Sequence, residues 1–414
     1  MWFDHFRATR EQLAAQDLLR QLRVAHGGTA PRQPVASAGG AVRELLMFCS
    51  NDYLGLAAHP ALAEALCEGV RRWGGGSGAS PLVSGHSQAH EAVAQWLGGA
   101  YAPHIPQARA LGFCTGYMAN LGVVTALGEA GVELFCDALN HASLIDGARL
   151  ARAQVTVWPH GDVAALEARL RASSAPRKLI VTDGVFSMDG DIAPLPALLA
   201  LAEAFDALLL VDDAHGLGVL GQQGLGCIEH FGLSSPRLVL VGTLGKSAGL
   251  AGAFVVAHQA VTDHLLQKAR NYIFSTASPP AIEHALLTAL ALLAGPEGQH
   301  RRHALAARCR QLREGLTELL QKHPELPWRL TDSTTPIQPL IVGSNAEAMR
   351  LAARLEQAGI RVPGIRPPTV PAGTARLRIT LCASHTEADV EQLLQVLRDA
   401  ASEAQMAEPE GADA

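Results

Sequence analysis

The feature that most constrains the fold is a regular alternation of short apolar runs and helical segments between Ala108 and Val256. Apolar runs of this length, bounded by glycine and polar residues, are typical of buried strands. Strands that alternate with helices indicate a largely parallel sheet covered on both faces. The predicted strands are Ala108–Phe113, Val132–Cys136, Gln154–Trp158, Lys178–Thr182, Ala207–Val211, Leu238–Val241 and Ala253–Val256. The sequence therefore predicts an α/β protein with a large, mostly parallel seven-stranded sheet.

Two neighbouring strands end in groups that can carry chemistry. Asp212 closes one apolar run and His215 follows it, while Lys246 lies in a glycine-rich turn after the next run. Because ligands bind beyond the carboxyl ends of such strands, we expect these side chains to lie close together. A lysine amine can attack a carbonyl once desolvation and its neighbours lower its pKa. We therefore predict that Lys246 holds pyridoxal phosphate as a Schiff base, with Asp212 against the ring nitrogen.

Other strand ends supply the remaining groups that this cofactor needs. His215 or Ser187 could hydrogen-bond the ring phenolate, and His141 could stack on the ring. A histidine at position 141 could instead cap the helix that follows it. The phosphate requires a helix N-terminus with exposed N–H groups, which Gly116 and Tyr117 supply, and Thr243 could add a hydroxyl.

Alternative interpretations of these motifs are less well supported. An isolated Gly-Lys-Ser turn is more typical of a solvated loop. Residues 216–221 match the dinucleotide pattern G-x-G-x-x-G, but they lie several residues after the strand, whereas the fingerprint glycines follow it directly. A P-loop would need a glycine where Leu240 stands. A metal site built from Asp212, Asp213 and His215 remains a less favoured alternative.

Composition excludes several classes of protein. The formal net charge of -6 gives no basic footprint for nucleic acid. No apolar stretch approaches the roughly 18 residues of a membrane span, and the N-terminus lacks the apolar core of a signal peptide. The seven cysteines form no Cys-x-x-Cys pair, which fits a reducing cytosol. We expect a cytoplasmic protein that binds neither nucleic acid nor membrane.

The length of 414 residues predicts more than one domain. Residues 1–50 are expected to form an amphipathic helix, Trp2–Val24, packed on the body or on a partner subunit, and a Pro/Gly linker over 27–40. Residues 51–295 form the large domain and residues 296–400 a smaller α/β domain. The acidic, aperiodic tail, residues 401–414, is expected to be disordered.

With these residues placed, the chain resembles the α-oxoamine synthases, which are pyridoxal-phosphate enzymes of the aspartate-aminotransferase fold (fold type I). The resemblance extends from about residue 15 to residue 400. Its motifs are Ser50–Gly55, Asn140–Ser143, Asp183–Gly190, Asp212–Gly216 and Thr243-x-Gly245-Lys246. The resemblance implies the same fold and cofactor for this chain.

Within the family, residues 365–371 and 373–378 are most similar to the member of the biotin pathway. This implies a decarboxylating condensation of L-alanine with a pimeloyl thioester, carried on CoA or on acyl carrier protein. Arg378 matches the family's carboxylate-binding arginine, with Asn51 nearby. Arg20 and Thr369 match positions that contact the substrate, and His141 is expected to contact it as well as the ring. For Arg20, a solvated helix charge is the alternative.

The resemblance also implies a homodimer, because Phe274-Ser275-Thr276 matches a segment that reaches the partner's phosphate. Two alternative functions stay open at this point. One is a family member that uses glycine or serine with another acyl-CoA. The other is a pyridoxal-phosphate aldolase or lyase that performs no acyl transfer.

Overall fold

The computed structural model describes residues 1–36 and 40–406 and divides the chain into two compact units. The first, here called the α/β unit, comprises residues 54–187 and 192–302. The second, here called the terminal unit, comprises residues 1–53, 188–191 and the chain from residue 303 on. Residues 37–39 of the predicted linker and 407–414 of the predicted tail lie outside the described residues.

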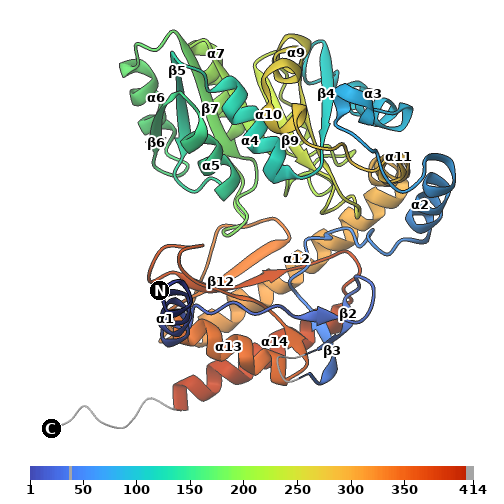
Figure 1. Ribbon diagram of the computed structural model, residues 1–414. Helices are drawn as coiled ribbons and strands as arrows, with labels where there is room; N and C mark the ends of the chain where they lie inside the picture. Colours follow the sequence, from blue (N-terminus) through green and yellow to red (C-terminus); the bar gives the residue numbers. More distant parts are fainter. Residues whose placement is uncertain (37–39, 407–414) are drawn as a thin grey trace. The chain divides into compact units, whose positions relative to one another are not determined.

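The α/β unit is built around a seven-stranded sheet of order β4-β10-β9-β8-β7-β5-β6 (Figure 1). Strand β10 runs antiparallel to both of its neighbours, and the other adjacent pairs are parallel. The strands are β4 (Ala108–Phe113), β5 (Val132–Asp137), β6 (Gln154–Trp158), β7 (Arg177–Asp183), β8 (Ala207–Asp212), β9 (Leu238–Thr243) and β10 (Ala253–His258). The helices are α2 (Pro60–Trp73), a short π-helix (Pro81–Gly85), α3 (Gln88–Tyr101), α4 (Gly116–Leu127), α5 (Ala142–Leu150), α6 (Val163–Ala172), α7 (Leu195–Ala204), α8 (Cys227–His230), α9 (Gln259–Lys268), α10 (Arg270–Ile273) and α11 (Pro280–Ala294). The predicted seven-stranded, mostly parallel sheet is confirmed.

Both faces of this sheet are buried, as the continuous apolar runs of its strands require. Alternate strand residues, such as Leu210, pack with Ala119 and Val123 of α4 in one core cluster. The residues between them, such as Leu209 and Leu240, are also fully buried. Because successive side chains of a strand point to opposite faces, helices must cover the sheet on both sides.

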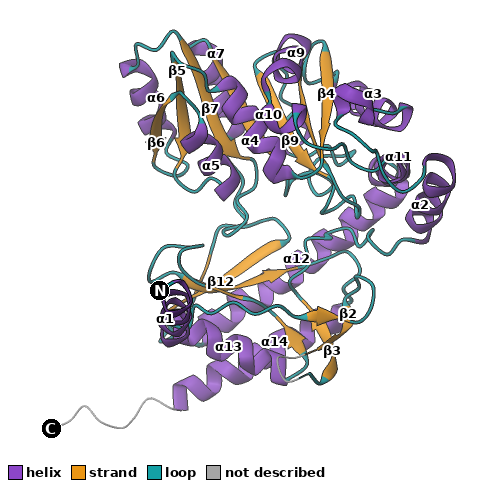
Figure 2. Cartoon of the chain, viewed as in Figure 1, coloured by secondary structure: helices purple, strands orange, loops and turns teal. Residues whose placement is uncertain are grey.

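The terminal unit contains two four-stranded sheets, of order β1-β2-β3-β13 and β11-β12-β15-β14 (Figure 2). Its elements are α1 (Trp2–Ala15), β1 (Val24–Ala25), β2 (Arg32–Ala36), β3 (Val42–Met47), β11 (Arg329–Leu330), β12 (Ile337–Gly343), α13 (Asn345–Gln357), β13 (Ile360–Arg361), β14 (Gly364–Ile365), β15 (Ala375–Thr380) and α14 (Glu387–Met406). Helix α12 (Pro296–Lys322) is divided between the two units after Arg302. The parallel pairing of β3 with β13 joins the start of the chain to its C-terminal part.

The N-terminal segment differs from its prediction. Helix α1 ends at Ala15 rather than near Val24, because Asp17 adopts a positive φ of 56° that a helix does not accommodate. No residue of α1 is buried, and Trp2, Phe3 and Phe6 are each more than half exposed. The predicted linker contains strand β2, whose Val35 is buried and which pairs with β3.

The predicted tail also differs at its start. Helix α14 continues through residues 401–406, which were expected to be disordered. Alanine, glutamate and glutamine, which make up most of this stretch, favour helix, and the turns before it pack Leu393 and Leu397 into the core.

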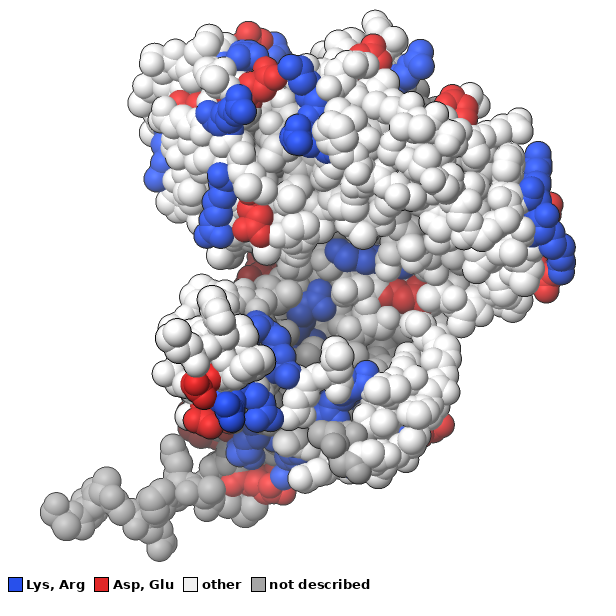
Figure 3. Space-filling model, in the orientation of Figure 1, with Lys and Arg blue, Asp and Glu red and all other residues white. Residues whose placement is uncertain are grey.

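Surface properties agree with the composition. On the face shown in Figure 3, basic and acidic side chains are interspersed with uncharged surface over the α/β unit. Among the described helices, none combines the length and hydrophobicity that a membrane span requires.

His385 connects the two ends of the chain inside the terminal unit. Its Nδ1 atom accepts the Cys382 N–H at 3.0 Å, and its Nε2 atom lies 3.1 Å from the Met47 carbonyl oxygen. The ring stacks on Phe48 with centroids 4.3 Å apart. Burial lowers the pKa of His385 from 6.5 to about 4, so the folded protein holds this ring in the neutral form.

We expect the stability of the terminal unit to fall as the pH falls from about 6.5 toward 4. The folded-state pKa of His385 lies below its unfolded value, so the contribution is complete above 6.5 and is lost as the unfolded chain takes up a proton. The difference between 6.5 and about 4 corresponds to about 3 kcal/mol. Urea denaturation at pH 7.5 and pH 5 should show a smaller pH dependence for His385→Gln than for wild type. The exposed His303→Gln variant should keep the wild-type dependence, and equal dependence in all three proteins would contradict this assignment.

Candidate active site

The carboxyl ends of β7, β8 and β9 bring the predicted chemical groups together. Asp183 and Asp212 are register partners at the ends of β7 and β8, and Asp212 pairs with Val241 of β9. Leu210 belongs to the core beneath α4, and Asp212, two residues later, points to the same face. Asp212 therefore projects toward the N-terminal half of α4.

The Asp212 carboxylate is buried and held by two donors. Asp212 is only 5% exposed. Oδ2 accepts a hydrogen bond from Asn120 Nδ2 at 2.5 Å, and Oδ1 accepts the Ala214 N–H at 3.0 Å. A buried carboxylate is stable only when it is paired or hydrogen-bonded, and a cationic ring nitrogen would complete its environment.

Lys246 and His215 are in direct contact. Lys246 lies in the turn after β9, and its Nζ atom is 2.8 Å from His215 Nε2. The turn that carries His215 is fixed by Asp213, whose Oδ2 accepts the Cys227 N–H at 2.6 Å. Burial raises the pKa of Asp213 to about 7. Gly216 and Gly226 leave the space that this carboxyl occupies, since a Cβ at either position would lie within 2.0 Å of it.

His141 serves as the N-cap of α5, as the alternative interpretation proposed. Its Nδ1 atom accepts the Ser143 N–H at 3.3 Å and lies 2.7 Å from Ser143 Oγ. Its own N–H donates to Asp183 Oδ2 at 2.7 Å. Burial lowers the pKa of His141, while Asp212 raises it and Lys246 lowers it. His141 therefore lies within electrostatic reach of both predicted cofactor residues, and capping α5 does not exclude stacking on a ring.

Asp183 is the second buried acid of this sheet edge. Burial raises its pKa well above the ordinary value, and the charge of Asp212 acts in the same direction. Two like charges in one buried site repel each other, which opposes ionisation of Asp183 beside Asp212. Asp183 anchors the backbone of His141 through Oδ2.

The N-terminus of α4 offers an anion site next to these groups. Thr115 caps the helix by accepting the Met118 N–H at 3.2 Å, which leaves the N–H groups of Gly116 and Tyr117 available. A Cβ at Gly116 would lie 3.6 Å from the Cβ of Thr243, so the two predicted phosphate residues are neighbours. The Tyr117 hydroxyl instead donates to Asp146. A buried carboxylate, an amine and a helix N-terminus at one sheet edge fit pyridoxal phosphate.

Two further predicted residues also belong to the α/β unit. Ser187 is half-buried and follows the end of β7 by four residues. Thr276 is exposed, and its carbonyl accepts a hydrogen bond from the Cys114 thiol, just before the N-cap of α4.

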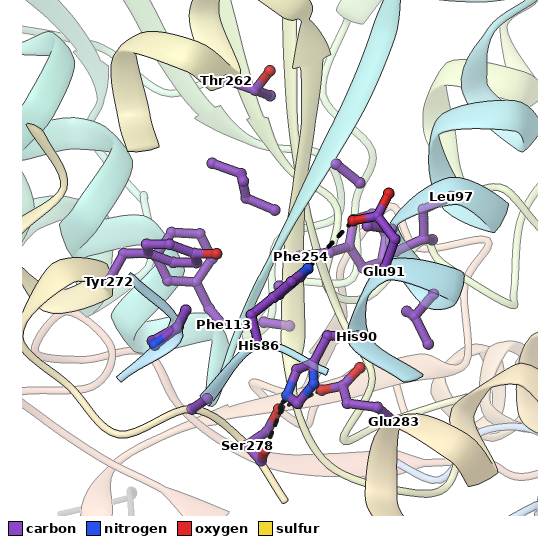
Figure 4. Close-up of a pocket in the computed structure, with 18 of the residues that line it drawn as sticks. His86, His90, Glu91, Leu97, Phe113, Phe254, Thr262, Tyr272, Ser278 and Glu283 are labelled. Atoms are coloured by element: carbon purple, nitrogen blue, oxygen red, sulfur yellow. Dashed lines mark hydrogen bonds and ion pairs between the residues drawn. The ribbon is translucent and has the colours of Figure 1, made fainter. Parts of the chain in front are cut away.

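Thr276 also lines a cavity of about 600 Å³ whose described lining does not include Lys246, Asp212 or His141 (Figure 4). His86 Nε2 lies 3.3 Å from Glu91 Oε2 on one side of it. His90 Nε2 lies 3.0 Å from the Ser278 carbonyl oxygen, and the Ser278 hydroxyl bonds Glu283. The lining of the cavity does include Cys114 and Leu244, the chain neighbours of Thr115 and Thr243.

The predicted substrate residues lie in the terminal unit. Arg378, on β15, is buried and donates to Asn51 Oδ1 at 3.3 Å, which the Tyr53 hydroxyl also bonds at 3.2 Å. Burial raises the pKa of Tyr53 to about 12. The structure thus joins Arg378 to Asn51, as the resemblance implied.

Arg20 and Thr369 are both exposed and belong to the same unit. The Arg366 carbonyl accepts the Thr369 N–H at 3.1 Å. Burial lowers the pKa of Arg366, Asp17 raises it, and Arg20 lowers it, so Arg20 lies within electrostatic reach of Arg366. Arg20 belongs to the segment after α1 and is not a helix residue.

Sequence analysis assigned no role to Asn120, Ser143 or Asp183, which contact the predicted residues directly. Asp183 and Ser143 occur within recognised motifs, and Asn120 lies four residues after Gly116 in the helix predicted to bind the phosphate. A polar residue on the apolar helix α4, where its neighbours Ala119 and Val123 are core residues, was the signal available for Asn120.

Comparison with known proteins gives the same result from three directions. Residues 43–397 match the model of the family "Aminotransferase class I and II". An 8-amino-7-oxononanoate synthase from Cupriavidus metallidurans is 59% identical over 97% of this chain and 98% of its own length. Serine palmitoyltransferase from S. paucimobilis, solved with bound pyridoxal phosphate and myriocin, has a TM-score of 0.86 at 31% identity and covers 97% of this chain and 98% of its own. An 8-amino-7-oxononanoate synthase structure from Francisella tularensis has a TM-score of 0.71 at 29% identity and covers 87% of this chain and 99% of its own.

Proposed function

Because the chain belongs to the aminotransferase class I and II family and, within it, to the α-oxoamine synthases, we propose that it catalyses the 8-amino-7-oxononanoate synthase reaction. This is the pyridoxal-phosphate-dependent, decarboxylating condensation of L-alanine with a pimeloyl thioester, an acyl transfer in biotin biosynthesis. The observation that carries the proposal is the 59% identity to such a synthase over nearly the full length of both chains. The scattered, unpaired cysteines favour a cytoplasmic location.

The residues of the sheet edge have distinct roles in this proposal. Pyridoxal phosphate, when bound, supplies an aldehyde that condenses with amines and a ring that withdraws electrons from the substrate α-carbon. Lys246 supplies the protein amine, and its Nζ atom, 2.8 Å from His215, can then take the α-proton from alanine. Asp212 would hold the positive charge on the ring nitrogen, and His141 would cover one face of the ring.

The phosphate and the phenolate oxygen of the cofactor would bind polar groups at the same edge. The N–H groups of Gly116 and Tyr117, with the Thr243 hydroxyl, would hold the phosphate. Ser187 and His215 would hydrogen-bond the phenolate oxygen.

The remaining predicted residues would contact the substrates. The guanidinium of Arg378, oriented by Asn51, is suited to a carboxylate, which it can bind through paired N–H groups. Arg20 and Thr369, which are both exposed, would contact the acyl substrate.

The test is incubation of the purified protein with L-alanine and pimeloyl-CoA, followed by mass spectrometry of the product. The expected product is 8-amino-7-oxononanoate, with release of CO2 and free thiol. Parallel reactions with pimeloyl-acyl carrier protein identify the carrier, and reactions with glycine or serine and other acyl-CoA substrates test the related family activities. Release of CO2 without any thioester would favour a lyase instead.

The same proposal includes a homodimer, to which Thr276 of one chain would contribute at the partner's phosphate. Large apolar side chains near this segment are exposed: Phe274 is 69% exposed, and Val83 and Leu82 of the π-helix are 79% and 51% exposed. Large apolar side chains that are exposed in one region of a surface are typical of a surface covered by a partner.

We expect Phe274→Asp to convert a dimer into a monomer, because a charge in an apolar interface must be desolvated on association. Light scattering after size exclusion should give twice the mass of one chain for wild type and the mass of one chain for the variant. Leu150→Asp, at an exposed leucine at the end of α5, is the matched control and should remain dimeric. A wild type that is monomeric at every concentration would contradict this part of the proposal.

A further inference from the structure

A continuous chain of hydrogen bonds connects Asp212 with His141 through Asn120 and Ser143. Asn120 Nδ2 lies 2.5 Å from Asp212 Oδ2 and 2.8 Å from Ser143 Oγ. Ser143 Oγ lies 2.7 Å from His141 Nδ1. Asn120 and Ser143 are 1% and 0% exposed, so water does not compete for these bonds. Three elements, α4, β8 and α5, meet in this chain.

The orientation of the Asn120 amide is fixed by its surroundings. Its Oδ1 atom has no hydrogen-bond partner among the described residues. If the amide were flipped, Oδ1 would lie 2.5 Å from Oδ2 of Asp212, and two acceptors repel each other at that distance. The NH2 group therefore faces Asp212 and Ser143, and each of its two protons has one acceptor.

The direction of the remaining bonds follows from the donor and acceptor inventory. Ser143 Oγ accepts a hydrogen bond from Asn120 Nδ2, which leaves the Ser143 hydroxyl hydrogen to be donated to His141 Nδ1. The same Nδ1 atom also accepts the Ser143 N–H. A ring nitrogen that accepts two hydrogen bonds carries no proton, so in neutral His141 the proton resides on Nε2.

We propose that Asn120 and Ser143 are positioning residues that act together: Asn120 holds Asp212 as the ionised partner of the ring nitrogen, and Ser143 holds the proton of His141 on Nε2. Burial of His141 favours the same neutral ring. The role of Asn120 toward the cofactor rests on the proposed function, whereas the proton position on His141 does not. A neutral ring stacks on the cofactor without placing a second cation beside the ring nitrogen, and it keeps Nε2–H as a donor for substrate.

The first arm of the test measures binding of pyridoxal phosphate to the apoprotein by fluorescence quenching. Asn120→Leu removes both donors, and Asn120→Asp keeps the shape of the side chain while replacing its NH2 group with oxygen. Each variant is expected to bind about 10-fold more weakly or worse, because a hydrogen bond to a charged group is lost. Thr125→Val, on the same helix, is the control and should bind as wild type does. Circular dichroism establishes that each variant is folded.

The second arm observes the His141 ring nitrogens of the apoprotein by 15N NMR, with the signals assigned by comparison with His141→Gln. Wild type should show a protonated Nε2 and an unprotonated Nδ1. In Ser143→Ala we expect part of the proton population to move to Nδ1, since its hydroxyl donor is gone. Unchanged ring signals in Ser143→Ala together with wild-type cofactor affinity in both folded Asn120 variants would overturn the inference. Failure of wild type to bind pyridoxal phosphate would overturn the proposed function instead, and the NMR arm would still decide the proton position on His141.

Discussion

Replacing Lys246 with alanine is expected to abolish both the covalent attachment of pyridoxal phosphate and the condensation reaction. The Nζ atom of Lys246 is the amine in contact with His215, and the removed group serves twice, for attachment of the cofactor and for transfer of the α-proton. Loss of a general base alone lowers rates by about 100- to 10,000-fold, so we expect turnover to fall by about 1,000-fold or more. The protein should also lose its yellow colour after gel filtration.

The chain allows this prediction to be checked at the level of one residue, because it contains only four lysines, at positions 178, 246, 268 and 322. Borohydride reduction followed by peptide mapping should place the cofactor mass on Lys246 in wild type and on no lysine in the variant. Lys268 is an exposed lysine at the end of α9, and its side chain faces Glu129. Lys268→Ala should therefore leave the attachment and the rate unchanged. A Lys246→Ala protein with wild-type colour and rate would refute the proposed chemistry.

The sheet of the α/β unit could be predicted because each strand is a local signal. The apolar run Leu208–Val211 predicts β8 without any information about the neighbouring strands. The observed strand includes only Asp212 in addition to the predicted Ala207–Val211. The contact of Lys246 with His215 follows from the same reasoning, since parallel strands end at one edge and their next residues must meet there.

The terminal unit was harder to predict because its sheets depend on pairings between residues distant in sequence. Strand β2 contains Pro34 and follows a glycine-rich segment, so the local pattern indicated a linker. Its burial depends on β3, which in turn pairs with β13 more than 300 residues later. No periodicity within residues 27–40 contains that information.

A single motif can also be divided between the two units. The stretch Asp183–Gly190 was interpreted as one motif, but the structure assigns residues 188–191 to the terminal unit. There the buried Arg376 forms a 2.6 Å ion pair with Asp189. Gly190 comes so near to Ile337 that a Cβ would lie 2.2 Å from its carbonyl oxygen. The sequence contained both halves of this contact without any sign that they meet.

The contacts around Asp212 could not be predicted for the same reason. Asn120, Ser143 and Asp212 come from α4, α5 and β8, and only the packing of both helices on one face of the sheet brings them together. Pattern analysis identified residues that react or bind at strand ends. It did not identify the buried amide that orients them, since a single asparagine in an apolar helix has no distinguishing spacing.

Replacing Asp212 with asparagine is expected to leave the cofactor bound while the exchange of the alanine α-proton collapses. Asparagine has nearly the same shape, and Lys246 and the N-terminus of α4 remain, so attachment should persist. The negative charge that holds a proton on the ring nitrogen is lost, however, and with it the ability of the ring to withdraw electrons from the α-carbon. In wild type, one Asp212 oxygen accepts a hydrogen bond from Asn120 and the other accepts one from Ala214. The amide of the variant must therefore turn its NH2 group toward one of these two donors.

Deuterium incorporation into L-alanine, followed by proton NMR in D2O without any thioester, measures this step alone. We expect the rate to fall by about 100-fold or more, as when a preorganised electrostatic contact is removed from other active sites. Asp206→Asn is the matched control, because Asp206 immediately precedes β8 at its opposite end, pairs with Arg237 on the surface and should leave the exchange rate unchanged. If Asp212→Asn exchanged the α-proton as fast as wild type while Lys246→Ala did not, the amine would be assigned correctly. In that case another residue would have to balance the charge of the ring nitrogen.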